Sequence, residues 1–397
     1  MKIAQINATC GVGSTGKICV SISKLLSSNK IENIVFYSSG NSDYHNSTKY
    51  MSELEVKCGA LEARLWGNFV YNSSKATRRL IKQLKAFDPD IVHLHNVHSH
   101  NCNLDLLFNY IKEERKKVLW TFHDCWAFTG SCTYFSYIEC DKWRNHCENC
   151  PKAHEFSWFF DTSHKLFEAK KKLLSDVNMI IVTPSEWLAE VTRQSFLMHK
   201  CIEVINNGID LSVFKPTSNQ FRKKHGIRDD QAMILGVGFE WGQRKGLDIF
   251  SKLTHNLPDN YRIVLVGTNE EIDKKIPESI IKIHRTNNQK ELAEIYTAAD
   301  VFVNPTREDN YPTVNMEALA CGTPVITFNT GGSPEMVDDT CGIVVEQDDL
   351  NGIIEAIRYV IESGLYSKES CLKKAIQFEQ NLCFKKYVDL YKKMELA

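Results

Sequence analysis

The chain has 397 residues, enough for two domains of about 200 residues that each bury a substantial core. Hydrophobic residues make up 43% and charged residues 24%, which excludes a disordered or collagen-like chain. Lys and Arg number 48 against 49 Asp and Glu, so no basic excess points to a nucleic-acid partner. No apolar run approaches the ~18 residues of a membrane span, and Gln5 and Asn7 interrupt any signal-peptide core. We therefore expect a cytoplasmic protein.

Short β-branched runs alternate with helical patterns along the whole chain, which predicts an α/β fold with doubly wound parallel sheets. The strands predicted in the first half span residues 2–7, 34–38, 90–95, 118–123, 179–183 and 202–205. Those predicted in the second half span residues 232–237, 262–267, 280–284, 301–304, 324–328 and 342–345. Helical patterns cover, among others, residues 60–87 and 352–362.

The boundary between two domains is predicted near Asn207 and Gly208, because Asn-Gly marks a turn and a polar stretch follows it. We expect an N-terminal domain over residues 1–205 and a C-terminal domain over residues 206–375. A last helix over residues 376–397 is expected to return to the first domain. Two such α/β units in tandem would place a cleft at the carboxyl ends of both sets of strands.

A glycine-rich segment follows the first predicted strand and opens a helix. Its residues Gly11, Gly13 and Gly16 fit the pattern G-x-G-x-x-G and, with the lysine that follows, nearly fit a P-loop. Ile18 stands where a P-loop has a metal-binding hydroxyl, and no acid ends the second strand, which disfavours NTPase and dinucleotide sites. Two interpretations remain open: a tight strand-to-helix turn, or backbone amides at Gly13 and Gly16 that face a phosphate.

A polar loop with two adjacent acids, Glu308 and Asp309, follows one strand of the second half. A helix is predicted next, because a proline suits its first turn and Gly-Thr-Pro ends it. Unpaired amides at its start, at Thr313 and Val314, favour a phosphate, and Glu317 leans back toward that start. Carboxylates on the loop and on the helix could hold hydroxyls on either side of a diphosphate. The alternative is a set of solvated acids around a helix N-terminus.

The block Glu-Ala-Leu-Ala-Cys-Gly-Thr-Pro-Val-Ile at residues 317–326 resembles the signature of the retaining GT-B glycosyltransferases of family 4. Further segments resemble that family, in its order and over nearly the whole chain: Asn-Gly-Ile-Asp at 207–210, Arg-Lys-Gly-Leu-Asp at 244–248, Ala-Asp-Val-Phe-Val-Asn-Pro at 299–305 and Gly-Gly-Ser-Pro-Glu at 331–335. The resemblance is closest to sugar transferases of capsule, exopolysaccharide and colanic-acid assembly. It implies two Rossmann-like domains that face each other across a cleft, and sugar transfer from a UDP- or GDP-linked donor with retention of configuration. It implies no cofactor at the reaction centre.

The resemblance also implies roles for single residues. Glu317 matches the acid that binds the donor ribose, and Lys245 matches one cation of a clamp on the donor diphosphate. Arg244 is the candidate for the second cation, because a phenylalanine replaces the arginine usual after the first strand of this domain. Asp309, by its spacing to Glu317, or its neighbour Glu308 matches the acid that holds the donor sugar. Such a clamp would stabilise the departing diphosphate, where negative charge builds up in the transition state.

A histidine, His123, ends a predicted strand of the first half. In the family that the chain resembles, a histidine there commonly touches the donor sugar, and the alternative is a core or orienting histidine. His93, His95 and His98 lie at the end of the preceding strand and predict a histidine-rich wall. Metal binding by these histidines is the weaker interpretation, because no third ligand is evident.

Five of the 14 cysteines fall between residues 125 and 150, in a loop expected over residues 125–151. Cys132, Cys140, Cys147 and Cys150 predict a structural zinc site, because the last two have knuckle spacing and the cytosol keeps thiols reduced. The alternatives are a pair of disulfides, or thiols without a metal in an aromatic loop. The loop is expected to line the acceptor pocket.

Residues 74–87 place basic side chains at helical spacing opposite apolar ones. The segment is either a solvated surface helix or a region attracted to an anionic membrane leaflet that bears a lipid-linked acceptor. We expect a glycosyltransferase that moves a sugar to a carbohydrate acceptor, lipid-linked, in surface-polysaccharide synthesis at the cytoplasmic face of the inner membrane. The alternatives are a nucleotide-sugar epimerase or phosphorylase of the same fold, and a non-catalytic, zinc-stabilised sugar-binding module.

Overall fold

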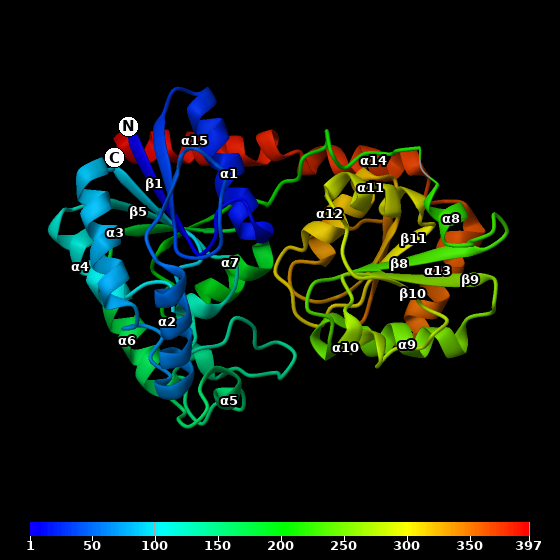
Figure 1. The fold of residues 1–397 in the computed structure, drawn as a ribbon, viewed down its shortest axis with the longest axis horizontal. Coiled ribbons are helices and arrows are strands. Elements are labelled where there is room, and N and C mark those ends of the chain that lie inside the picture. Colours follow the sequence, from blue (N-terminus) through cyan, green and yellow to red (C-terminus); the bar gives the residue numbers. More distant parts are fainter. Residues whose placement is uncertain (99, 219, 397) are drawn as a thin grey trace. The chain divides into compact units, whose positions relative to one another are not determined.

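Two parallel sheets, each covered by helices, organise the chain in a computed structural model that describes residues 1–98, 100–218 and 220–396. The chain divides into two units (Figure 1). The first unit is formed by Met1–Asn206 together with the segment from Cys383 onward, and the second by Asn207–Leu382. This result confirms the predicted α/β class with doubly wound parallel sheets.

The sheet of the first unit has seven strands in the order β3-β2-β1-β4-β5-β6-β7, all parallel. The strands are β1 (Lys2–Asn7), β2 (Glu32–Tyr37), β3 (Ser47–Lys49), β4 (Ile91–Leu94), β5 (Lys117–Thr121), β6 (Met179–Thr183) and β7 (Cys201–Val204). The helices are α1 (Gly13–Ser28), α2 (Glu53–Trp66), α3 (Ser74–Phe87), α4 (Leu104–Glu113), α5 (Ala153–Phe156), α6 (Ser163–Ser175), α7 (Glu186–Arg193) and α15 (Gln380–Leu396). The six strands predicted for this half form within two residues of their expected bounds, and β3 was not predicted.

The single helix expected over residues 60–87 is wrong, because the chain forms α2 and α3 with a break between them. The break begins at Gly67, which ends α2 in the left-handed conformation at a φ of +62°. A side chain there would place its Cβ 2.5 Å from Oγ1 of Thr162. Only glycine fits this combination of backbone angle and close approach.

The sheet of the second unit has six parallel strands in the order β10-β9-β8-β11-β12-β13. The strands are β8 (Ala232–Val237), β9 (Tyr261–Val266), β10 (Ile281–Ile283), β11 (Val301–Asn304), β12 (Val325–Phe328) and β13 (Gly342–Val345). The helices are α8 (Phe221–Lys224), α9 (Leu247–Asn256), α10 (Glu270–Asp273), α11 (Gln289–Ala298), α12 (Thr313–Ala320), α13 (Leu350–Ser363) and α14 (Lys368–Ala375). Every strand predicted for this half forms, within two residues of its expected bounds.

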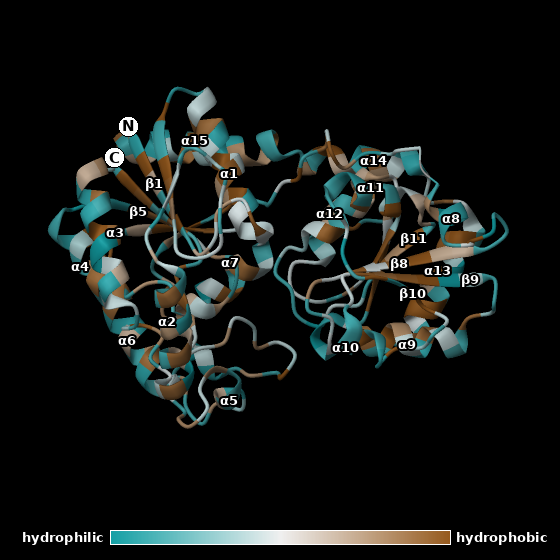
Figure 2. Cartoon of the chain, viewed as in Figure 1, coloured by the Kyte–Doolittle hydropathy of each residue, from teal (hydrophilic) through white to brown (hydrophobic). Residues whose placement is uncertain are grey.

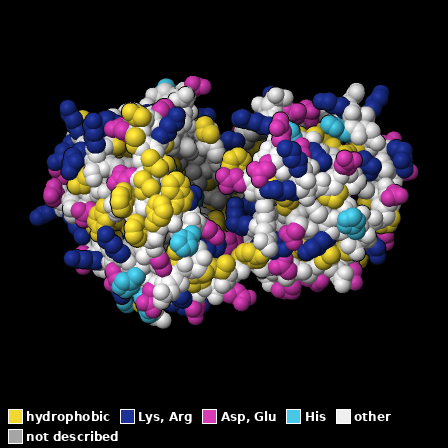
Figure 3. Space-filling model, turned by 60° about the horizontal axis from the view of Figure 1, so that its bottom comes forward, with side chains coloured by type: hydrophobic (Ala, Val, Ile, Leu, Met, Phe, Trp, Pro, Cys, Tyr) yellow, Lys and Arg dark blue, Asp and Glu magenta, His cyan; other side chains and the backbone are white. Residues whose placement is uncertain are grey.

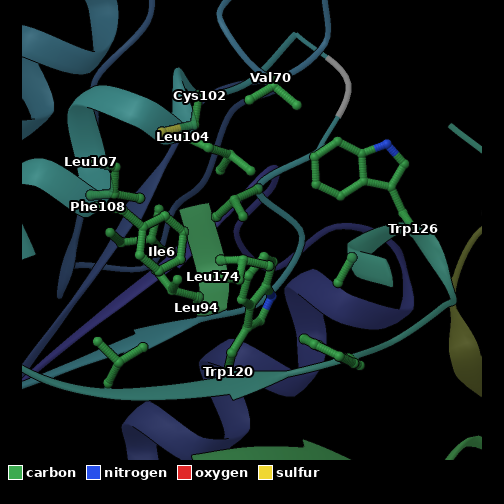
Figure 4. Close-up of a cluster of buried hydrophobic side chains, with 14 of the residues drawn as sticks. Ile6, Val70, Leu94, Cys102, Leu104, Leu107, Phe108, Trp120, Trp126 and Leu174 are labelled. Atoms are coloured by element: carbon green, nitrogen blue, oxygen red, sulfur yellow. The ribbon is translucent and has the colours of Figure 1, made fainter. Parts of the chain in front are cut away.

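Apolar residues of the strands fill the cores on both faces of each sheet. In Figure 2 the strands are mostly coloured as hydrophobic, and hydrophilic and hydrophobic residues alternate along the helices. On one face of the first unit, Ile6, Leu94 and Trp120 from the central strands pack with Leu107 and Phe108 of α4 (Figure 4). Because helices cover both faces of the central parallel strands, the sequences of these strands are almost entirely apolar.

The last helix, α15, completes the opposite face of the first unit's sheet. Its Phe384 and Tyr387 pack in the same buried cluster as Ile3 and Leu119. The hydroxyl of Tyr391 lies 2.6 Å from Nδ1 of the buried His93. The helix begins at Gln380, and its residues belong to the first unit from Cys383 onward, whereas the sequence analysis began this segment at residue 376.

Candidate functional site

In the second unit, the loop that follows β11 carries the two adjacent acids. Oδ2 of Asp309 lies 2.5 Å from Nζ of Lys245, and both side chains are about one-fifth exposed, at 19% and 18%. Glu308 is 2% exposed, and its backbone oxygen accepts a hydrogen bond from the guanidinium of Arg244 at 3.1 Å. The structure therefore brings both predicted cations onto the acidic loop, and only Asp309 pairs its carboxylate with Lys245 among the contacts described here.

The two cations lie in the turn between β8 and α9, which packs closely on the loop after β11. Gly246 follows Lys245 at a φ of +70°, and a Cβ there would lie 2.2 Å from the backbone oxygen of Pro305. The amide of Arg307 donates to the backbone oxygen of Arg244 at 2.8 Å. Since both strands end at the same edge of the sheet, a cation-bearing turn and an acid-bearing loop become one surface.

Arg307 is a buried residue of this surface that the sequence analysis did not single out. Its guanidinium forms a two-pronged ion pair with Asp248, at 2.8 and 2.9 Å, and also contacts Asp348. The hydrogen bond with Asp248 raises the pKa of Arg307 above its usual range. The Arg307 guanidinium also donates a hydrogen bond to the backbone oxygen of Gln243, which directly precedes Arg244 and Lys245. Arg307 thus joins the acidic loop to the turn that carries the two cations. In the sequence, the only indication of this role was its position directly before Glu308 and Asp309.

The helix after the acidic loop, α12, begins at Thr313. Pro312 is its N-cap, whereas the sequence predicted that this proline lies in the first turn of the helix. Neither a side-chain cap nor an acidic residue occupies its first turn, and Thr313 and Val314 are partly exposed. The amides of a helix start with these properties suit an anion. Glu317, also partly exposed, accepts a hydrogen bond of 3.1 Å from the hydroxyl of the buried Tyr296.

Two glycines after β12 support the acidic loop from its other side. Gly331 has a φ of +55°, and a Cβ there would lie 1.8 Å from the backbone oxygen of Asp309. The amide of Gly332 donates to the backbone oxygen of Asn310 at 2.8 Å. Of the Gly-Gly pair in the sequence, Gly331 therefore lies so close to Asp309 that a residue with a side chain would not fit there.

In the first unit, the glycine-rich turn joins β1 to α1. Gly11 and Gly13 have φ values of +73° and +68°, and the amide of Gly11 donates to the backbone oxygen of Gly16 at 3.0 Å. Gly16 is buried, and a Cβ there would lie 2.8 Å from Oγ1 of Thr9. Gly13 is exposed at the start of α1, which has no side-chain cap and no acid in its first turn. The turn is tight, and it also presents an uncapped helix start.

The predicted histidines gather at the carboxyl ends of β4 and β5. Nε2 of His123 lies 3.1 Å from Nδ1 of His95, and Nε2 of His98 lies 3.1 Å from a carboxylate oxygen of Asp124. His123, His98 and Asp124 line one pocket of this unit. Burial lowers the pKa of His123 to about 4, so its ring is neutral at neutral pH. A neutral imidazole can donate one hydrogen bond and accept another.

Two family models match the chain: Glycosyltransferase Family 4 over residues 16–213, and Glycosyl transferases group 1 over residues 217–378. The chain belongs to glycosyltransferase family 4. It is thus a nucleotide-sugar glycosyltransferase of a retaining family with the GT-B fold, as the resemblance in the sequence implied.

A curated relative and two solved structures align with this family 4 enzyme over most of their lengths. WcaC of Escherichia coli K12, by name a colanic acid biosynthesis glycosyl transferase, is 22% identical over an alignment of 379 positions that covers 86% of this chain and 88% of WcaC. The sucrose-phosphate synthase of Thermosynechococcus elongatus superposes with a TM-score of 0.73 at 16% identity and covers 100% of this chain and 99% of its own. Anabaena HepE, solved with UDP-glucose, has a TM-score of 0.69 at 13% identity, and the match covers 99% of this chain and 100% of the HepE chain. The structural matches show the GT-B fold.

The cysteine-rich loop of this family 4 enzyme gives the zinc prediction no support. Cys132, Cys140, Cys147 and Cys150 line one small pocket, but the described residues hold no group of three or more His, Cys, Asp or Glu that could bind a metal ion. No disulfide joins any of the described cysteines either. The spacing did predict that the four cysteines gather.

Three of the four thiols in this pocket make a hydrogen bond within the protein. A hydrogen bond from Cys132 lowers the pKa of Cys150 to about 7, and the same bond raises the pKa of Cys132. The sulfur of Cys147 accepts a hydrogen bond from the amide of Gly130 at 3.2 Å. Cys132 and Cys150 therefore lie within hydrogen-bond reach of each other, and a zinc ion bound by all four cysteines stays without support among the described residues.

Proposed function

We propose that this family 4 enzyme transfers a hexosyl group from a nucleotide-diphosphate sugar to a carbohydrate acceptor, a lipid-linked oligosaccharide, in surface-polysaccharide synthesis. The likeness to WcaC over most of both chains supports this role. No helix in residues 1–98, 100–218 or 220–396 is long and apolar enough to cross a membrane. In this proposal the second unit holds the nucleotide of the donor, and the first unit binds the acceptor.

The paired charges of Lys245 and Asp309 are the observation that carries the proposal. An ammonium group has three N–H donors, so Lys245 can hold Asp309 and a diphosphate oxygen at the same time. Asp309 then holds hydroxyls of the donor sugar next to the phosphate that leaves, and Arg244 is the second cation of the clamp. Glu308 is the alternative acid, and its deep burial disfavours it.

The helix start at α12 and the carboxylate of Glu317 form the nucleotide side of the proposed donor site. Thr313 and Val314 offer backbone amides to the diphosphate, and Glu317 accepts hydrogen bonds from the ribose hydroxyls. The hydrogen bond from Tyr296 fixes the direction of the Glu317 carboxylate. A ligand with a diol at one end and a diphosphate at the other matches this set of groups.

In the first unit, we propose that neutral His123 hydrogen-bonds the transferred sugar and that the turn at Gly13 and Gly16 offers amides to the donor phosphate. During transfer, the bond between the anomeric carbon and the phosphate oxygen breaks, and the acceptor oxygen bonds to that carbon on the same face. The departing phosphate takes the acceptor proton, which balances the reaction without a separate base. The cation clamp stabilises the charge that develops on that phosphate.

Nucleotide release from a panel of UDP- and GDP-sugars, with and without an oligosaccharide acceptor, tests the proposal. Lys245→Ala should lower kcat by roughly 10²-fold, as for the loss of a group that stabilises transition-state charge. Lys275→Ala, which removes an exposed lysine of the same unit, is the matched control and should leave kcat unchanged. Equal kcat values for the two variants would overturn the clamp, and a change in KM alone would assign Lys245 to uniform donor binding.

A further inference from the structure

One face of α2 is apolar although it faces solvent. Leu54 is 71% exposed and Leu61 is 52% exposed, and the exposed Cys58 lies between them on the helix. Residues four and three positions apart share one side of a helix, so these three side chains form a stripe. A surface helix that covers a core normally exposes its polar side chains to solvent. Along this stripe, α2 exposes apolar side chains instead.

Four exposed aromatic rings form a second apolar group, at the carboxyl end of α2. Trp66, the last residue of the helix, stacks on Phe160 with ring centres 6.2 Å apart and planes 11° apart. Phe159 and Trp158 continue the series, with ring centres 6.4 Å from Phe160 to Phe159 and 6.5 Å from Phe159 to Trp158. Every one of the four side chains is about half exposed or more, and Phe159 reaches 65%.

The loop that carries these rings is fixed to the end of α2 by backbone hydrogen bonds. The amide of Trp158 donates to the backbone oxygen of Arg64 at 2.8 Å. The hydroxyl of Thr162 donates to the backbone oxygen of Gly67 at 2.9 Å. The rings therefore stand in water on a preformed backbone. We call Leu54, Leu61, Trp66, Trp158, Phe159 and Phe160 the α2 patch.

A basic helix lies beside the α2 patch. Helix α3 contains no acidic residue, and Lys75, Arg78 and Lys82 are exposed on it at spacings of three and four. An ion pair of 2.9 Å between Arg79 of α3 and Glu55 of α2 joins the two helices. On the face shown in Figure 3, hydrophobic side chains gather on the first unit, with Lys and Arg side chains along their border.

We propose that the α2 patch and the basic residues of α3 dock the first unit onto an anionic lipid surface. Trp and Phe rings partition into the boundary between head groups and acyl chains, and exposed lysines and arginines attract anionic head groups. Contiguous exposed apolar patches mark interaction sites, and the flanking cations favour a charged lipid surface over an apolar protein partner. The inference rests on the proposed function, because a lipid-linked acceptor lies in such a surface.

Co-sedimentation of the full chain with vesicles tests this docking surface, without donor or acceptor. Vesicles of phosphatidylethanolamine with phosphatidylglycerol should bind the protein more tightly than vesicles of phosphatidylcholine, and salt should weaken the binding. Phe159→Ser with Phe160→Ser should reduce the partition coefficient at least tenfold, since each buried ring contributes more than 1.4 kcal/mol. Leu365→Ser, at an exposed leucine of the second unit, is the matched control and should not change it.

A second variant separates the charge from the rings. Replacing Lys75, Arg78 and Lys82 with Gln should remove the preference for phosphatidylglycerol and the effect of salt. Unchanged binding by either variant, or no binding by the wild-type chain, would overturn the proposal. A stable dimer that the ring substitutions dissociate would also overturn it and assign the patch to a second copy. Nucleotide release measured with a soluble acceptor on the same variants tests the proposed function separately, so the two failures are distinguishable.

Discussion

Glu308 and Asp309 are neighbours in the chain with unlike surroundings. Asp309 pairs with Lys245 on a partly exposed surface, whereas Glu308 is 2% exposed. Asp309→Asn keeps the shape and removes the charge, so we expect kcat to fall by roughly 10²-fold. Glu308→Gln should change kcat by less than about tenfold, if the fold tolerates it. Steady-state kinetics with the preferred donor decide, and equal mild effects would mean that neither carboxylate holds the sugar.

The carboxylate of Glu317 makes a contact that can be separated from its proposed role. Glu317→Ala should raise the dissociation constant of the donor and largely abolish turnover, because the ribose loses its acceptor group. It also leaves the buried hydroxyl of Tyr296 without this partner, at a cost of about 1–3 kcal/mol in stability. Tyr296→Phe is the control, since it removes that hydrogen bond and keeps the carboxylate. Calorimetric titration with donor should show a much smaller loss for the control.

At these single positions, the sequence singled out candidate residues, and most of their contacts became evident only in the structure. The spacing between the acids selected Asp309, and the structure places that residue against Lys245. Arg307 was overlooked because its role depends on two aspartates far away in the chain, Asp248 and Asp348. The cysteine spacing likewise predicted that four thiols gather, and the described residues give no support to a metal site among them.

The acidic loop keeps its position because the backbone at Gly331 passes directly behind Asp309. Gly331→Ala places a Cβ against the backbone oxygen of Asp309, so the loop has to move. We expect kcat/KM to fall by more than about tenfold, as small displacements of positioning groups do. Gly364→Ala is matched, since its φ of +63° carries the same backbone cost of about 1 kcal/mol and its Cβ meets open space. A similar activity loss in both variants would contradict the positioning role.

The carboxyl ends of β4 and β5 hold histidines that are neutral in the folded protein. Burial lowers the pKa of His93, His95 and His123, the last to about 4. Between pH 6.5 and 4 the unfolded chain binds protons that the folded chain does not, so stability falls as the pH falls. Urea unfolding followed by tryptophan fluorescence at pH 7, 6 and 5 should show this loss. His123→Gln should reduce the slope by up to about 1.4 kcal/mol per pH unit, and an unchanged slope would contradict the assignment.

Elements with a strong apolar signal were predictable, and those without it were not. Buried parallel strands such as Met179–Thr183 and Ala232–Val237 form with the expected bounds because both of their faces are covered. Strand β3 escaped notice because it is a polar edge strand of three residues. The break at Gly67 was missed because the helical pattern continues through it, whereas the glycine is required by its left-handed backbone and by its contact with Thr162.

The two units are joined through the end of the chain as well as its middle, since α15 belongs to the first unit. Ending the chain at Leu382 removes the buried Phe384, Tyr387 and Tyr391, each worth about 3 kcal/mol or more. The sum rivals the whole stability of a domain, so we expect the first unit to unfold. Tryptophan fluorescence reports the event, because six of the seven tryptophans lie in that unit.

A variant with Lys385→Ala and Lys392→Ala is the control for this truncation, because both side chains are exposed on the same helix. It should melt like the wild-type chain. The second unit should keep its own structure in the truncated protein, with Trp241 still buried. If the truncated first unit melted as the wild type does, the packing of α15 would contribute little.

The position of α15 also sets an order of events on the ribosome. Domains are usually completed in the order of their synthesis, N-terminal first. Here residues 207–382 emerge before the helix that closes the first unit, so the unit that is begun first is finished last. Until α15 has emerged, the nascent chain displays the apolar face built from Ile3, Ile22 and Leu119, which α15 later covers. Chaperones that bind exposed apolar surface therefore have a target on this chain throughout the synthesis of its second half.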